Sequence, residues 1–210
     1  MKAALFDLDG VIIDSESTYT KFWAAIGSEY GCAPTFAYDI KGTNLTDILN
    51  HFDSEDVRAE IRGKIHDFEQ TMTYPIFPGV MEFIADLRRA RIKTALYTSS
   101  DNTKMMYLER EHPSLCGLFD AVVTGSMVSK SKPDPEGYLK AAELVGCDIK
   151  ECYVFEDSYQ GVEAGRRAGA VVIALATTNP AVKLKEKAHE VIDNFIGFNV
   201  EKMLAVGRDN

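Results

Sequence analysis

The sequence predicts an α/β protein: a doubly wound parallel sheet, Rossmann-like in its layering, with an inserted domain of α-helices. Three observations support this prediction. Short apolar segments recur along the chain, helical patterns separate most of them, and one long stretch near the start is helical throughout. With 210 residues, 46% of them hydrophobic, the chain can bury a sizeable core.

Five segments have the character of buried parallel strands, because they are short, rich in β-branched or aromatic residues, and apolar on both faces. They span residues 3–6, 93–98, 120–125, 152–157 and 170–175. Helical patterns cover residues 79–91, 135–146 and 159–169. Strands and helices therefore alternate, as they do in a doubly wound sheet.

Residues 15–76 interrupt this alternation. Their amphipathic segments are helical in pattern, with no convincing strand among them, and span residues 15–31, 45–52 and 54–72. The insert begins at Asp14-Ser15 and ends in the 74–79 stretch, whose two prolines suit a hinge. We expect an α/β core made of residues 1–14 and 77–210, and a helical cap made of residues 15–76.

Composition excludes several classes of function. The net charge of −9 and the pI near 5 argue against a nucleic-acid surface, which needs clustered lysine and arginine. The first residues carry no secretory apolar run, and no later run approaches the length of a membrane span. We therefore expect a soluble, cytoplasmic protein with no membrane partner, and by default a monomer.

Cysteine and histidine spacing gives no sign of a metal site of the zinc type. The cysteines show no CxxC pattern and lie beside apolar or turn residues, so we expect reduced packing residues at Cys32, Cys116, Cys147 and Cys152. The histidines are too scattered for a zinc site: His51, His66, His112 and His189.

Two aspartates follow the first strand, in the stretch ALFDLDGV. Ligands collect at the carboxyl ends of parallel strands, and Asp7 and Asp9 stand where this strand ends. Gly10 then allows a tight turn. Two carboxylates about 4 Å apart repel by roughly 4 kcal/mol at an effective dielectric near 20, so the pair needs protonation, wide spacing or a cation. Taken alone, the pair could also cap a helix or a turn.

A second acidic pair, Glu156 and Asp157, follows the strand at 152–157. If the two strand ends meet, four acidic groups converge, and such a density of hard oxygen ligands matches Mg²⁺ sharing its site with a substrate phosphate. In isolation, Glu156 and Asp157 would more often be the N-terminal cap of the next helix.

Candidate anion ligands follow the strand at 93–98. Thr98, Ser99 and Ser100 precede a helix, and hydroxyl groups with free amides at a helix N-terminus suit a phosphate. Plain capping by Ser100 or Asp101 remains the alternative. Lys132, directly before a proline, could bring a fixed positive charge to the same edge, although a lone surface lysine is normally only solvated.

These four pieces, in this order, resemble the haloacid dehalogenase-like hydrolase superfamily, and most closely its β-phosphoglucomutase-like branch of phosphatases and mutases. The family motif DxDGxxxD is matched by Asp7, Asp9, Gly10 and Asp14, and the hydroxyl motif by Thr98. The lysine motif is matched by Lys132 with Pro133 and Pro135, and the acidic motif by Glu156, Asp157, Ser158 and Gly161. The resemblance covers nearly all of the core.

The resemblance implies a role for each motif residue. Asp7 would be the nucleophile that forms an aspartyl-phosphate, and Asp9 the general acid and then the base. Mg²⁺ would be held by the Asp7 side chain, the Asp9 backbone carbonyl and Asp157, with Glu156 nearby. The transferring phosphoryl oxygens would be bound by Thr98, the amides of Ser99 and Ser100, and Lys132. An acid at Asp9 argues against dehalogenation, because a halide leaving group needs no proton.

The insert resembles the helical cap of this family, which excludes water and selects the substrate. Residues 39–49 resemble the cap loop of the mutase branch, which makes candidate substrate contacts of Lys41, Gly42 and Thr43. The chain departs from the mutases at two points. Asn44-Leu45-Thr46 stands where an arginine would hold the distal phosphate of the sugar, and Tyr19 replaces an acid-base histidine.

Both departures weaken the retention of a bisphosphate intermediate, so a phosphatase is favoured over a mutase, with a small phosphorylated metabolite as its substrate. The branch, rather than any one residue, indicates a sugar or sugar-alcohol phosphate.

A receiver-type signalling domain uses a similar aspartate, hydroxyl and lysine set, but it is shorter and has no helical insert. A binding scaffold without catalysis is the third reading, and the intact motifs argue against it.

Overall fold

A computed structural model describes residues 2–207, and its centre is a six-stranded parallel sheet in the order β3-β2-β1-β4-β5-β6. The strands are β1 (Ala3–Phe6), β2 (Lys93–Tyr97), β3 (Ala121–Val123), β4 (Cys152–Glu156), β5 (Val171–Leu175) and β6 (Glu190–Ile192). In the register, Leu5 lies opposite Ala95 on one side and Val154 on the other. The predicted fold class is confirmed, and β1 occupies the middle of the sheet.

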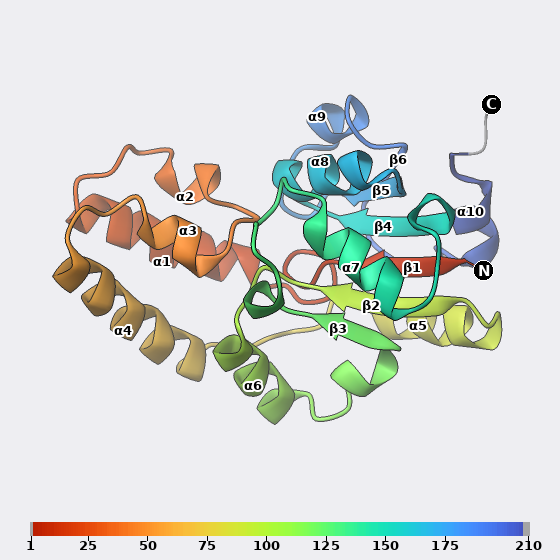
Figure 1. The fold of residues 1–210 in the computed structure, drawn as a ribbon, viewed down its shortest axis with the longest axis horizontal. Helices are drawn as coiled ribbons and strands as arrows, with labels where there is room; N and C mark the ends of the chain where they lie inside the picture. The colour runs from red at the N-terminus through yellow and green to blue at the C-terminus, as the bar shows by residue number, and fades with distance from the viewer. Residues whose placement is uncertain (1, 208–210) are drawn as a thin grey trace.

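Helices cover both faces of the sheet, as Figure 1 shows. The buried side chains of α5 (Val80–Arg89), α6 (Asn102–Glu111) and α10 (Val200–Ala205) pack with Phe6 on one face. Those of α7 (Glu136–Leu144), α8 (Tyr159–Ala168) and α9 (Ala181–Lys185) pack with Leu5 on the other. Because successive side chains of a strand point to opposite faces, β1 contributes to both apolar cores.

Four helices precede α5 and share a hydrophobic core of their own. They are α1 (Glu16–Glu29), α2 (Phe36–Asp39), α3 (Leu45–Leu49) and α4 (Glu55–Thr71). Trp23, Phe36 and Ile61 are buried among them, and in Figure 1 these helices form the lobe at the left, beside the sheet. We refer to α1–α4 as the cap helices. Two chain crossings join the lobes: the amide of Asp14 donates to the Pro75 carbonyl at 2.8 Å, and Ile13 bridges to Ile76.

The observed elements are shorter or more numerous than the sequence patterns predict. The strand expected at 120–125 ends at Val123, because the chain turns into a 3-10 helix at Gly125–Met127. The sequence shows no clear helical or strand pattern for the short elements α2, α9, β6 and α10. For example, β6 has three residues, none of them buried. Two further 3-10 helices lie at Cys116–Leu118 and Ile149–Glu151.

Within residues 2–207, none of the helices combines the length and the apolar composition that crossing a bilayer requires. No disulfide bond joins the cysteines, all four of which fall in the described part of the chain, and Cys147 and Cys152 are buried in the core.

Candidate active site

The order of the strands brings three of the sequence motifs to one place. β1 lies between β2 and β4, so the residues that follow these three strands are neighbours at the carboxyl edge of the sheet. Asp7 extends β1, and its amide donates to the Phe155 carbonyl of β4 at 3.0 Å. Thr98 continues β2, and its amide donates to the Val123 carbonyl of β3 at 3.0 Å. Parallel pairing thus fixes the positions of Asp7 and Thr98 through the backbone.

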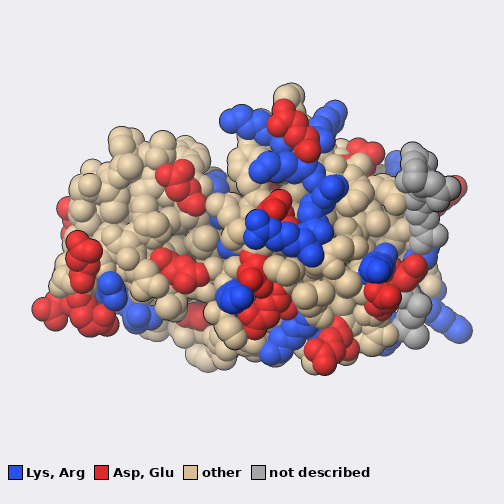
Figure 2. Space-filling model, turned by 45° about the horizontal axis from the view of Figure 1, so that its top comes forward, with Lys and Arg blue, Asp and Glu red and all other residues tan. Residues whose placement is uncertain are grey.

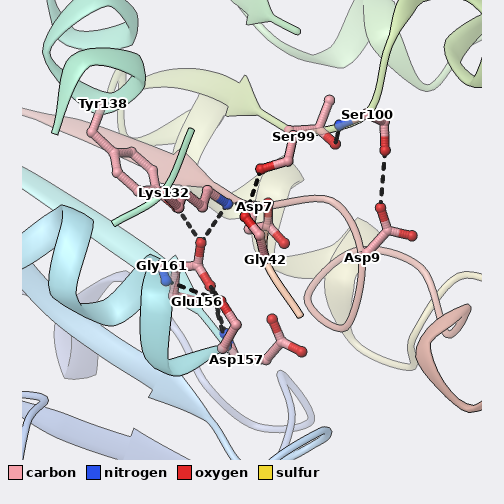
Figure 3. Close-up of polar contacts among 12 residues, drawn as sticks. Asp7, Asp9, Gly42, Ser99, Ser100, Lys132, Tyr138, Glu156, Asp157 and Gly161 are labelled. Carbon is pink, nitrogen blue, oxygen red and sulfur yellow. Dashed lines mark hydrogen bonds and ion pairs between the residues drawn. The ribbon is translucent and has the colours of Figure 1, made fainter. Parts of the chain in front are cut away.

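The two aspartates of the first motif point in different directions, as Figure 3 shows. Asp7 faces Lys132, whereas Asp9 faces Ser100. Gly10, the residue after Asp9, adopts a positive φ of 78°. A Cβ atom on Gly10 would lie 1.9 Å from Oδ2 of Asp157. The turn therefore requires glycine both for its backbone conformation and for the close approach of Asp157.

Lys132 is buried, and its ammonium group joins two carboxylates. Nζ lies 2.5 Å from Oδ1 of Asp7 and 2.5 Å from Oε1 of Glu156. Burial acts to lower the pKa of Lys132, but the Asp7 and Glu156 charges together raise it above its usual value. The ring of Tyr97, with its centroid 4.8 Å from Nζ, adds a cation–π contact. Lys132 therefore carries a fixed positive charge beside Asp7.

Glu156 has hydrogen bonds at both carboxylate oxygens. Oε1 accepts from Lys132 and, at 2.7 Å, from the Tyr138 hydroxyl. Oε2 accepts from the amides of Asp157 and Ser158 and from the Ser158 hydroxyl. The contacts of Glu156 are those of a residue that holds Lys132 and the loop after β4 in position.

Asp7, Glu156 and Asp157 present ligand atoms that all lie within 4.8 Å of one another. Burial, opposed by Lys132 and reinforced by Glu156 and Asp9, raises the pKa of Asp7 to about 8. Burial, and then the charges of Glu16 and Glu156, raises the pKa of Asp157 well above its usual range. Oδ2 of Asp157 is buried and has no hydrogen-bond partner among residues 2–207. A cluster of hard oxygen atoms in which one carboxylate oxygen has no partner fits a divalent cation such as Mg²⁺.

The hydroxyl residues after β2 are not the cap of the following helix. Asp101 caps α6 by accepting from the amides of Thr103 and Lys104, so the capping alternative falls on Asp101 alone. The Ser100 amide donates to Oγ1 of Thr98 at 3.0 Å, and the Ser100 hydroxyl donates to Asp9 at 3.3 Å.

The structure also places the predicted cap-loop residues over this edge. Lys41, Gly42 and Thr43 line the same cavity as Asp7 and Asp9. The Gly42 carbonyl accepts from the Ser99 hydroxyl at 2.8 Å, which fastens the cap loop to the core. Lys41 pairs with Glu16 at 3.2 Å, and the Thr43 hydroxyl donates to the Ile40 carbonyl. All the predicted site residues are therefore gathered around one cavity or directly behind it.

Sequence reasoning missed three charged residues that line this cavity, Glu16, Glu69 and Lys104. Lys104, on α6, contacts Asp9, and Glu69, on α4, accepts from the Tyr19 hydroxyl at 2.7 Å. The side chains of Lys104 and Glu69 are buried although charged. None of the three belongs to a motif, and only the position of Lys104 in the first turn of a helix that starts at the site edge could have suggested it.

Every lysine lining the cavity is paired with a carboxylate: Lys41 with Glu16, Lys104 with Asp9, and Lys132 with Asp7 and Glu156. No arginine lines the cavity within the described part of the chain. On the face seen in Figure 2, lysine and arginine are interspersed with aspartate and glutamate. The described residues that line the cavity therefore offer an anionic ligand no lysine or arginine without a carboxylate partner.

The chain is similar in sequence and fold to known proteins. The family model of the haloacid dehalogenase-like hydrolases matches residues 1–169. Hexitol phosphatase A of Escherichia coli is 33% identical over 195 residues, which cover 88% of each chain. A phosphorylated carbohydrates phosphatase of Thermotoga maritima is 32% identical over 179 residues, or 80% of this chain and 82% of that protein. A solved structure, a putative β-phosphoglucomutase from Bacteroides vulgatus, covers 97% of this chain and 89% of its own, with a TM-score of 0.81 and 27% identity.

Proposed function

The chain belongs to the haloacid dehalogenase-like hydrolase family, and from this premise we propose that it is a Mg²⁺-dependent phosphatase acting on a sugar or sugar-alcohol phosphate. Membership and the curated relatives make it a phosphoric monoester hydrolase. The observation that carries the proposal is the convergence of Asp7, Lys132 and Asp157 at one sheet edge, with Asp9 beside them. The named substrates of the relatives, hexitol phosphates and phosphorylated carbohydrates, support the substrate class.

In the first half of the reaction, a carboxylate oxygen of Asp7 attacks the phosphorus atom. The bond between phosphorus and the alcohol oxygen breaks, and Asp9 gives its proton to that oxygen, so that a neutral alcohol leaves. Lys132 provides positive charge next to the attacking carboxylate, at 2.5 Å from Oδ1 of Asp7. The product of this half is an aspartyl-phosphate on Asp7.

In the second half, a water molecule attacks the phosphorus atom of the aspartyl-phosphate. Asp9, now a carboxylate, takes a proton from that water, and the bond between phosphorus and Asp7 breaks to release inorganic phosphate. Asp7 is regenerated, and Asp9 is protonated again for the next turnover. Thr98, Ser99 and Ser100 would bind the equatorial phosphoryl oxygens together with Lys132.

Asp7 and Asp157, with the backbone carbonyl of Asp9, would hold Mg²⁺, and the bound ion would supply charge that lowers the repulsion between an anionic nucleophile and an anionic ester. Glu156 would act behind them, because both of its oxygens are already bonded to Lys132, Tyr138 and the loop after β4. The cap helices would close the cavity and exclude bulk water.

A phosphosugar mutase is the alternative within the same family, and the similarity to a putative β-phosphoglucomutase keeps it open. A mutase must hold a second phosphate away from the nucleophile. In the described cavity each lysine already has a carboxylate partner, and the lining also includes the acids Glu16 and Glu69. This charge distribution favours release of the dephosphorylated product over retention of a bisphosphate.

The proposal is tested by phosphate release from a panel of hexitol and hexose phosphates, with Mg²⁺ and with EDTA. We expect Mg²⁺-dependent release from the wild type, and a loss of at least about 1,000-fold in Asp7→Asn, because the nucleophile is absent; a cooperative melting transition shows that the variant is still folded. A coupled assay for conversion of β-glucose 1-phosphate to glucose 6-phosphate runs in parallel. Isomerisation faster than phosphate release would establish the mutase instead.

A further inference from the structure

Lys104 is a buried lysine whose charge is directed at the predicted acid-base residue. Its side chain is 5% exposed, and Nζ lies 2.6 Å from Oδ1 and 2.6 Å from Oδ2 of Asp9. The Ser15 hydroxyl donates to Oδ1, and the Ser100 hydroxyl donates to Oδ2 at 3.3 Å. Contact with both oxygens fixes the carboxylate plane as well as its position.

The same ammonium group lies against the cap helices. Nζ is 4.3 Å from the centroid of the Tyr19 ring on α1. The Tyr19 hydroxyl donates to Oε1 of Glu69 on α4 at 2.7 Å, and the Glu69 carbonyl accepts from the Tyr74 hydroxyl at 2.8 Å. Asp9, Lys104, Tyr19 and Glu69 therefore form a continuous chain of contacts from the core to both long helices of the cap.

We propose that Lys104 is a positioning residue that orients the Asp9 carboxylate for proton transfer, and that Tyr19 and Glu69 of the cap hold Lys104 in place. The inference rests on the proposed function, since it assigns Asp9 as the acid and base. Burying an ammonium group is costly unless it is paired and hydrogen-bonded, and an exposed lysine would serve helix α6 equally well. The contact between the Lys104 ammonium group and the Asp9 carboxylate therefore explains why Lys104 is buried.

If Lys104 positions Asp9 for proton delivery, the effect of removing Lys104 depends on how much the leaving group needs that proton. Phenolate is a poor leaving group and needs the proton from Asp9, whereas 4-nitrophenolate departs readily without it. The two esters have similar shapes, so they pose similar demands on binding. The value of kcat/KM includes substrate binding and the steps up to departure of the leaving group but not hydrolysis of the aspartyl-phosphate, and the ratio between the two esters then reports on this proton transfer.

The experiment measures kcat/KM for phenyl phosphate and 4-nitrophenyl phosphate in wild type and Lys104→Met. Methionine keeps the length and burial of the side chain without its charge. We expect at least about a 10-fold loss on phenyl phosphate and less than about 3-fold on 4-nitrophenyl phosphate. Glu69→Gln should shift the ratio in the same direction by a smaller factor. The matched control is Lys140→Met, whose lysine lies outside the cavity and donates to the Met127 carbonyl.

Equal losses on both esters in Lys104→Met would overturn the inference, because they would show a role in folding or substrate binding alone. An unchanged ratio in Glu69→Gln would overturn the link to the cap. Melting temperatures identify any variant that fails to fold, and Lys104→Gln then replaces Lys104→Met in the same comparison. If the wild type hydrolyses neither ester nor any sugar phosphate, the proposed function fails; if it hydrolyses them with an unchanged ratio in the variants, only this inference fails.

Discussion

At the scale of single residues, the candidate site contains more buried carboxylates than its one buried lysine beside them can compensate. Asp7, Glu156 and Asp157 are buried side by side, and Lys132 compensates two of them. Asp157 has no such partner, and its pKa is raised mainly by burial. The free energy needed to keep such a cluster comes from the packing of the surrounding strands, and a cation that binds there relieves part of it.

This charge excess predicts how stability without metal depends on pH. The pKa of Asp7, raised to about 8 chiefly by burial, exceeds its value in the unfolded chain. Between about pH 4 and pH 8 the folded state therefore binds more protons than the unfolded state, so the free energy of unfolding falls as the pH rises through this window. Thermal melting in EDTA at pH 5 and pH 8, in a common ionic strength, should show the lower midpoint at pH 8.

Bound Mg²⁺ and the substitution Asp157→Asn should each reduce the loss of stability at pH 8. Saturating Mg²⁺ should raise the melting midpoint at pH 8 by about 3 °C, and by less at pH 5, where protons compete with it. Asp157→Asn should melt higher than the wild type in EDTA at pH 8 and should gain little from Mg²⁺. A Mg²⁺ effect of the same size in Asp157→Asn would place the ion elsewhere.

At the scale of elements, the N-terminus of α8 holds a buried carboxylate of the site in position. The Ser158 side chain caps α8 by accepting from the Gly161 amide at 3.0 Å. Gly161 then faces Glu156 so closely that a Cβ atom would lie 1.8 Å from Oε1. The helix therefore packs directly on the carboxylate that holds Lys132, and this packing leaves no room for any side chain.

Gly161→Ala should displace Glu156 and with it Lys132. We expect at least about a 10-fold fall in kcat and a destabilisation of about 1–3 kcal/mol, from steric strain against buried groups. Urea denaturation and phosphate release measure the two effects. The control is Gly63→Ala on α4, where a Cβ atom would meet nothing within 4 Å, and alanine there should stabilise by about 0.5–1 kcal/mol with activity unchanged. Full activity in Gly161→Ala would refute the positioning of Lys132 by Glu156.

At the scale of the whole molecule, the cap helices contact the core along α4 and α6, where Tyr107 bonds to His66, and through polar contacts of the cap loop and α3. The side-chain amide of Gln160 on α8 donates to the backbone carbonyl of Asp39 in the cap at 3.1 Å, and the Ser99 hydroxyl donates to the Gly42 carbonyl. Ser131 donates to Asp47 of α3. The residues of the Gln160–Asp39 and Ser131–Asp47 contacts are not among those that line the cavity, so the population in which the cap helices contact the core depends in part on hydrogen bonds outside the proposed catalytic residues.

Gln160→Ala should therefore raise KM with little change in kcat. Loss of one exposed hydrogen bond is worth about 1 kcal/mol, or roughly a 5-fold rise in KM for the best substrate of the panel. Steady-state kinetics measure this split. Gln70→Ala, an exposed glutamine near the end of α4, is the matched control. A fall in kcat at unchanged KM would show instead that Gln160 acts on the chemical step.

The sequence by itself determined the parallel sheet, because buried parallel strands are apolar on both faces and their pattern survives without knowledge of the fold. It also indicated that Asp7, Thr98, Lys132 and Asp157 would meet, because each follows a strand or a turn at the same edge of such a sheet. It did not indicate β6, whose three residues are too few and too exposed to leave a pattern.

Only the tertiary structure decided which side chains close the site from outside the motifs. Lys104 reaches Asp9 from α6, 95 positions along the chain, and Glu69 reaches Tyr19 across 50 positions. Such pairs depend on how a helix is placed against a loop or against another helix, and that placement leaves no local pattern in the sequence. The charges that complete the cavity follow from packing, whereas the motif residues follow from where strands end.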